Sequence, residues 1–108
     1  MRDGLIRETT EVIKKELEAA NKKFPAFNSR HEGYAVILEE IEETHAAFNN
    51  TKALVERIWW LTKGNSEKTE YKKLVEDATK AAREMAAEAI QTAAMLQKLL
   101  DYTSSKES

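Results

Sequence analysis

The sequence predicts an all-α fold, and three observations support this prediction. Glycine occurs three times and proline once in 108 residues, so few positions interrupt a helix. No segment alternates apolar and polar residues between turn residues, which is the pattern of a half-buried strand. Apolar residues recur instead every three or four positions, as they do on one face of an amphipathic helix. We expect a compact bundle of three to four helices with a long C-terminal helix.

The first helix is expected to end before the segment "FPAFN" at 24–28. Its apolar residues, spaced by three or four positions, are Leu5, Ile6, Val12, Ile13, Leu17, Ala20 and Phe24. Pro25 ends this helix, because a residue that precedes proline avoids helical geometry.

The second helix is expected to begin at a capping box, "SRHE", in which the Ser29 hydroxyl and the Glu32 carboxylate satisfy each other's backbone N–H groups. Its predicted buried stripe consists of Ile37, Ile41 and Phe48, flanked by Tyr34 and Leu38. The poor helix formers "NNT" at 49–51 predict a kink or an interruption. The apolar period then resumes at Leu54, Val55, Ile58 and Leu61. Gly64 and Asn65 are typical of a helix C-cap.

The last helix is expected to follow an N-cap at Ser66 and to be the longest. Its predicted seam consists of Tyr71, Leu74, Val75, Ala78, Ala82, Met85, Ala89, Thr92, Leu96 and Leu99. The alanines allow close helix approach, which suits a bundle packed on itself or on a second copy of the chain. We expect one domain over residues 1–103 and a frayed polar tail at 104–108.

Composition excludes several classes of function. Lysine and arginine number 17 against 19 acidic residues, and this balance argues against nucleic-acid binding. The absence of cysteine removes disulfides, thiolate zinc sites and cysteine nucleophiles. No run of eighteen apolar residues and no apolar leader are present, so we expect a soluble, cytoplasmic protein without a membrane partner.

The segment "LEEIEE" places four glutamates, Glu39, Glu40, Glu42 and Glu43, within five positions. Like charges three and four residues apart repel by about 0.2 to 0.5 kcal/mol per pair, and no lysine or arginine lies within four residues. A solvated acidic face is one interpretation of this segment. A cation site is the other, because the glutamates border the apolar stripe.

The last helix carries a second oxygen-rich stripe, formed by Glu84, Glu88 and Gln91 beside the predicted seam. Carboxylate and amide oxygens on facing helices are typical ligands of Mg²⁺ or Mn²⁺ in helical bundles. The two stripes therefore favour a cation site.

Glu39-Glu40-x-x-Glu43 followed by Glu88-x-x-Gln91 resembles the motifs of MazG-like nucleoside triphosphate pyrophosphohydrolases, which belong to the all-α pyrophosphatase superfamily. The segments "FNSRHEGYAVILEEIEE" and "AAEAIQTAAM" are closer still to small bacterial and phage members, and together they cover about a quarter of the chain. The resemblance implies a MazG-like, all-α fold completed by dimerisation. It also implies a magnesium-activated water that attacks a nucleotide phosphate and releases pyrophosphate.

Carried over residue by residue, the resemblance implies that Glu40, Glu43 and Glu88 bind the metal. Glu39 would be a further ligand or the base that orients water, which makes Glu39 and Glu40 the catalytic candidates. Gln91 takes the place of the usual aspartate as a ligand, and its neutral amide should lower metal affinity. Glu84, one turn before Glu88, could partly compensate.

Three residues are candidates for nucleotide binding. Lys98 lies two turns after Gln91 on the same face, where it either meets the triphosphate or is a solvated lysine near a helix C-terminus. Tyr34 either packs in the core or lines a pocket. Of Trp59 and the adjacent Trp60, one should be in the core, and the other should contact a second copy or stack on a base.

Three hypotheses follow from the sequence. The first is a homodimeric or tetrameric magnesium-dependent (or manganese-dependent) nucleotide pyrophosphohydrolase. The second is a protein of the same fold that binds or sequesters a nucleotide or a nucleotide signal without hydrolysis, which the Gln91 departure favours. The third is a helical interaction or assembly protein whose acidic stripes are only solvated.

Overall fold

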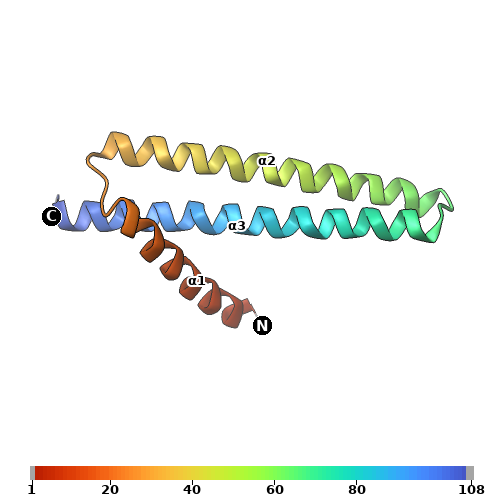
Figure 1. Ribbon diagram of the computed structural model, residues 1–108, viewed down its shortest axis with the longest axis horizontal. Helices are drawn as coiled ribbons and strands as arrows, with labels where there is room; N and C mark the ends of the chain where they lie inside the picture. Colours follow the sequence, from red (N-terminus) through yellow and green to blue (C-terminus); the bar gives the residue numbers. More distant parts are fainter. Residues whose placement is uncertain (1, 107–108) are drawn as a thin grey trace.

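The computed structural model describes residues 2–106, which form three helices (Figure 1). Helix α1 spans Arg2–Lys23, α2 spans Arg30–Lys63 and α3 spans Lys68–Lys106. No strand occurs within residues 2–106, which confirms the all-α prediction. At 39 residues, α3 is the longest helix, as predicted.

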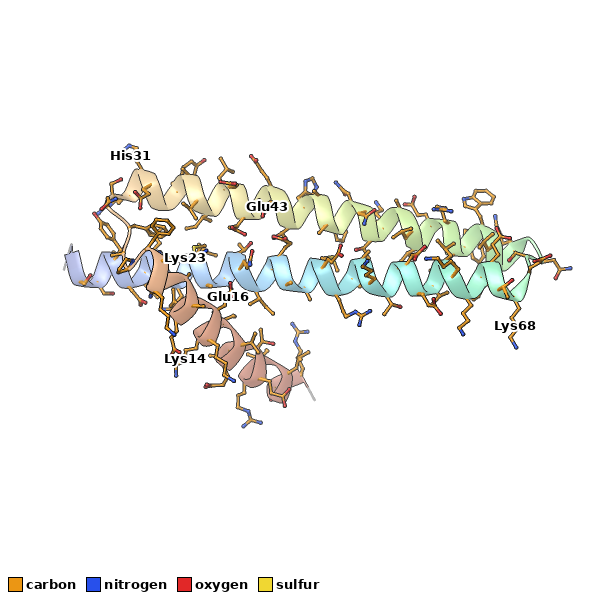
Figure 2. The ribbon with its side chains drawn as sticks, viewed as in Figure 1. Lys14, Glu16, Lys23, His31, Glu43 and Lys68 are labelled. Carbon is orange, nitrogen blue, oxygen red and sulfur yellow. The ribbon has the colours of Figure 1, made fainter. Side chains whose placement is uncertain are left out.

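Helices α2 and α3 form a long antiparallel hairpin, and α1 crosses α3 obliquely and then diverges from it (Figure 1). His31 and Lys68, near the first residues of α2 and α3, mark opposite ends of the hairpin (Figure 2). The molecule measures 61 × 29 × 22 Å and has a Cα radius of gyration of 18.2 Å. A compact domain of this length has a radius of roughly 13 Å. The prediction of a compact bundle was therefore wrong for the single chain.

Helix α2 continues without interruption through the segment 49–51, where we expected a kink. The Thr51 hydroxyl donates a hydrogen bond to the Ala47 carbonyl, 2.9 Å away, so the threonine is accommodated on the preceding turn. The low helix propensity of these three residues destabilises α2 only slightly, and the packing of α2 along α3 outweighs this effect.

The helix ends follow local signals in the sequence. The Ser29 hydroxyl accepts a hydrogen bond from the Glu32 N–H at 3.1 Å, as predicted. The other half of the box is shifted by one residue, because the Glu32 carboxylate accepts from the Asn28 N–H at 3.2 Å. At the end of α2, the Gly64 N–H donates to the Trp60 carbonyl, and Asn65 adopts the left-handed conformation with φ of 56°.

Two predicted boundaries of α3 differ from the structure. Ser66 does not cap α3, because its hydroxyl donates to the Leu61 carbonyl of α2 at 3.0 Å and α3 begins at Lys68. The expected frayed tail is helical as far as Lys106, and positions 107–108 lie outside the described residues.

The buried core is small. Among the described residues its apolar members are Leu17, Phe27, Ile37, Leu74, Ala78, Ala81 and Ala94. The predicted buried stripe of α2 holds only at Ile37, since Ile41, Phe48 and Leu38 are exposed. The apolar stripe of α2 is too wide for one helix to cover, so α3 buries only one edge of it.

The aromatic residues that were candidates for the core are also exposed. Tyr34 is 66% exposed, and Trp59 and Trp60 are 57% and 66% exposed. Both tryptophan rings lie near the ammonium group of Lys63 at the end of α2. Packing in the core of the single chain is therefore the wrong interpretation for Tyr34, and neither tryptophan is a core residue. Within residues 2–106, no helix combines the length and the apolarity needed to cross a membrane.

Candidate metal centre

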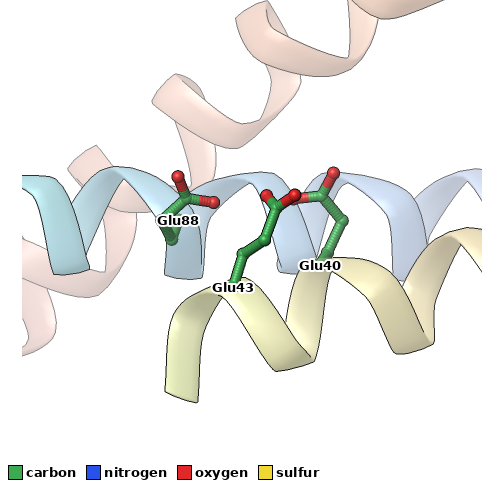
Figure 3. Close-up of side chains that lie close together, drawn as sticks. All are labelled: Glu40, Glu43 and Glu88. Carbon is green, nitrogen blue, oxygen red and sulfur yellow. The ribbon is translucent and has the colours of Figure 1, made fainter. Parts of the chain in front are cut away.

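Three of the predicted ligands meet between α2 and α3. Glu40, Glu43 and Glu88 each place one carboxylate oxygen within 4.8 Å of the others. Figure 3 shows Glu40 and Glu43 projecting from neighbouring turns of α2, with Glu88 on the facing side of α3. Glu40 and Glu88 are half-buried, whereas Glu43 is exposed. We call these three residues the carboxylate cluster.

A pair of threonines holds the two helices in the register that forms the cluster. The hydroxyls of Thr44 and Thr92 lie 3.0 Å apart across the α2–α3 contact. Thr44 follows Glu40 by one turn and its hydroxyl lies 2.8 Å from the Glu40 carbonyl; Thr92 stands in the same relation to Glu88, at 3.0 Å. Because α2 and α3 are antiparallel, Glu40 and Glu88 lie on either side of this threonine contact along the hairpin (Figure 1). The sequence alone does not predict this pairing, because nothing in a single sequence specifies the register between two helices.

The cluster contains buried oxygens that lack hydrogen-bond partners. They are Oε2 of Glu40 and Oε2 of Glu88, and the only other such side-chain atom in the described residues is Oδ1 of Asn21. Leaving a buried acceptor unpaired costs about 1 to 3 kcal/mol, and more when the group is charged. A cation bound between the two helices would give both oxygens a partner.

The electrostatic field of the cluster disfavours negative charge on Glu40. Burial raises the pKa of the Glu40 carboxyl, and the neighbouring charges of Glu43, Glu88, Glu39 and Glu16 raise it further. Acidic groups therefore crowd around one half-buried carboxyl, and a divalent cation would relieve this repulsion directly.

Glu16 of α1 is the one acidic neighbour that the sequence analysis did not identify. It is half-buried on the part of α1 that lies next to α3 (Figure 2), and its Oε1 accepts a hydrogen bond from Gln91 Nε2 at 3.5 Å. Its position beside Leu17, which is buried, was the available signal. Sequence alone does not reveal how closely α1 approaches α3.

Gln91, Glu39 and Glu84 do not belong to the cluster. Gln91 is exposed and turned toward Glu16 of α1. Glu39 is exposed and acts on Glu40 through its charge. Glu84 is exposed and is not among the convergent carboxylates. The structure thus brings together three of the four predicted ligands.

The predicted nucleotide-binding residues lie apart from the cluster. Lys98 is only 7% exposed, and its Nζ donates to the Phe24 carbonyl at the end of α1. It is therefore neither a solvated lysine nor a free cation in the groove beside the cluster. Tyr34 is nearly two turns before Glu40 on α2, and Trp59 is more than four turns after Glu43, so neither reaches the cluster within one chain.

The donor set of the cluster fits a hard divalent cation. Three carboxylates supply only oxygen ligands, which Mg²⁺ and Mn²⁺ prefer, and their number leaves coordination positions for water or phosphate oxygens. No histidine joins them within the described residues, which argues against zinc. The chain matches no protein-family model, no curated protein and no solved structure.

Proposed function

We propose that this protein is a magnesium- or manganese-dependent nucleotide pyrophosphohydrolase of MazG-like type, which converts a nucleoside triphosphate and water to the monophosphate and pyrophosphate. The observation that carries the proposal is the convergence of Glu40, Glu43 and Glu88 from two helices, with two buried oxygens unpaired. These are the three carboxylates among the four residues for which the resemblance implies metal binding.

In the proposed reaction, Glu40, Glu43 and Glu88 hold the cation between α2 and α3. A divalent cation bound there supplies charge neutralisation at phosphate oxygens and lowers the pKa of bound water. Glu39, exposed beside the cluster, accepts a proton from the attacking water. The water oxygen bonds to the α-phosphorus, and the bond from that phosphorus to the bridging oxygen breaks as pyrophosphate leaves.

The proposed functional unit is a homo-oligomer, a dimer or a tetramer. Large apolar side chains are exposed along all three helices of the single chain, including Tyr34 and Trp59, our candidates for nucleotide contacts. Because neither residue reaches the cluster of its own chain, their exposed side chains support the oligomer and give no nucleotide contact within one chain.

A second candidate function is nucleotide binding or sequestration without hydrolysis, and the position of Gln91 favours it. This residue offers no charge and is paired with Glu16 of α1. A site with three carboxylates instead of four binds the cation more weakly, so a bound nucleotide could remain intact.

Product analysis tests the proposal. The purified protein is incubated with ribo- and deoxyribonucleoside triphosphates and Mg²⁺ or Mn²⁺, and the products are resolved by anion exchange. We expect monophosphate and pyrophosphate in equal amounts from at least one nucleotide. The Glu40→Gln variant should produce neither.

Glu42→Gln is the matched control, because Glu42 is exposed on the same helix and is not part of the cluster. Turnover that survives Glu40→Gln would contradict the proposed site. Tight nucleotide binding without turnover would support the second function. Thermal stability unchanged by both metal and nucleotide would leave the third hypothesis, an assembly protein.

A further inference from the structure

Two rows of exposed or half-buried residues follow a seven-residue repeat along the hairpin. Successive members of each row are four and then three positions apart. On α2 the row is Tyr34, Leu38, Ile41, His45, Phe48, Lys52, Val55 and Trp59; on α3 it is Val75, Thr79, Ala82, Ala86, Ala89, Ala93, Leu96 and Leu100. We call the two rows together the heptad face. Such a repeat is typical of a helix surface that packs against another helix, yet no helix within residues 2–106 covers it.

The two rows adjoin each other and form one surface. A groove of about 530 Å³ runs between them, with Ile41 and Phe48 on one side and Ala86 and Ala89 on the other. At 100° per residue, the rows lie on one flank of the α2–α3 contact, while Glu43 and Gln91 lie on the other flank with α1. The surface formed by the two rows is therefore separate from the carboxylate cluster.

The heptad face carries little charge. Charged residues make up 33% of the whole chain, but among the sixteen positions of the face the ionisable side chains are His45, Lys52 and the tyrosine Tyr34. Two copies of this surface can meet without bringing rows of like charges together. A strongly charged partner would find no complementary groups here.

The two rows also differ in side-chain size. The α2 row is bulky, with Ile41, Phe48 and Trp59, and each of these is about half exposed. The α3 row is narrow over its central part, because four of its members are alanines. Large side chains of one helix pack well against small ones of another. A single chain thus carries both the projecting row and the narrow row.

We propose that a second copy of this chain packs on the heptad face, with α2 of each copy lying against α3 of the other. With a two-fold axis between the copies, the contact between the α2 row of one copy and the α3 row of the other occurs twice. The result is an antiparallel four-helix bundle. Residues 34–59 span about 38 Å, and two adjacent helices are about 19 Å wide. The resulting footprint of roughly 700 Å² is close to the 800 Å² per partner of a stable interface.

Sedimentation velocity on the full chain tests the assembly. The wild type should sediment as a dimer of a 12.3 kDa chain. Ala89→Asp places one charge per copy in the interface and should raise the dissociation constant by about 100-fold or more. Ala53→Asp is the matched control: Ala53 is an exposed alanine of α2 outside the heptad face, so this variant should remain dimeric. Circular dichroism checks that both variants stay helical.

A wild-type monomer at high micromolar concentration would overturn the proposal. So would an oligomer of any size that Ala89→Asp leaves intact. Neither result depends on whether the protein hydrolyses nucleotides.

Cross-linking tests which helices meet. The chain has no cysteine, so Phe48→Cys and Ala86→Cys each introduce a single thiol. When the two variants are mixed and allowed to exchange subunits, a short thiol cross-linker should join unlike copies in preference to like copies. Preferential joining of Phe48→Cys to itself would show that α2 faces α2 and would overturn the proposed arrangement.

Discussion

Lys98 Nζ lies 2.5 Å from the carbonyl oxygen of Phe24, so the last part of α3 binds the final residue before Pro25. The same ammonium group lies 5.0 Å from the centre of the Phe27 ring. Lysine is seldom buried to this extent, and here its charge is stabilised by a carbonyl dipole and an aromatic face. Lys98 therefore holds the end of α1, and the connection that follows it, against α3.

Lys98→Met should lower the free energy of unfolding by about 1.5 to 3 kcal/mol, because it removes a charge-assisted hydrogen bond and keeps the aliphatic packing. Urea denaturation measures this loss. Limited proteolysis should cut the 24–29 connection faster in the variant. Lys80→Met, at an exposed position of α3, is the matched control and should leave stability nearly unchanged. Unchanged stability in Lys98→Met would contradict this role of the Lys98–Phe24 hydrogen bond.

Glu40→Gln should stabilise the metal-free protein, because a neutral amide relieves the repulsion around a half-buried carboxyl. The same variant should lose the stabilisation that the wild type gains from Mg²⁺ or Mn²⁺. For the wild type that gain is about 2.7 kcal/mol when the cation concentration is 100 times its Kd. Thermal unfolding with and without the cation measures both effects. Equal stabilisation of wild type and variant by the cation would exclude Glu40 as a ligand.

The stability of the metal-free protein should depend on pH through Glu40. Because the pKa of this carboxyl is raised in the folded state, the folded chain binds its proton more tightly than the unfolded chain does. The contribution of Glu40 is thus fully favourable below the ordinary value of 4.5 and is lost as pH rises through the raised pKa. Urea denaturation across this range should show a difference in slope between the wild type and Glu40→Gln. Parallel curves would contradict the assignment.

Gln91→Asp should have opposite effects without and with metal. In the metal-free protein the new carboxylate faces Glu16 and lies one turn after Glu88, so repulsion should lower stability by a few tenths of a kcal/mol. With a cation present, the added charge should raise affinity several-fold, which isothermal titration with Mn²⁺ measures. Gln97→Asp, at an exposed position nearly two turns further along α3, is the control. Unchanged affinity in Gln91→Asp would show that position 91 is too far from the cation.

Local signals in the sequence predicted the local structure well. The absence of strands, the Ser29 cap, the stop at Pro25 and the end of α2 at Gly64 are confirmed. Each depends on residues within one turn of one another. The convergence of Glu40 and Glu88 was predicted only as facing stripes, and the structure places these two residues together.

Two local predictions were wrong, the N-cap at Ser66 and the kink at 49–51. The other errors concern contacts between helices. Apolar spacing identified Ile41 and Phe48 as an apolar stripe but could not show that α3 leaves them exposed. The same limitation applies to Lys98, whose burial depends on where α1 ends relative to α3. Helical periodicity tells which residues share a face, and it does not tell what covers that face.

The long hairpin of α2 and α3 also determines the order in which contacts can form during folding. Contacts beside the turn at 64–67 close short loops and cost little chain entropy. Each step away from the turn closes a longer loop, and the Thr44–Thr92 contact joins residues 48 positions apart. We therefore expect the hairpin to zip from its turn, so that the carboxylates meet late. The contact of Lys98 with Phe24, 74 positions away, forms later still.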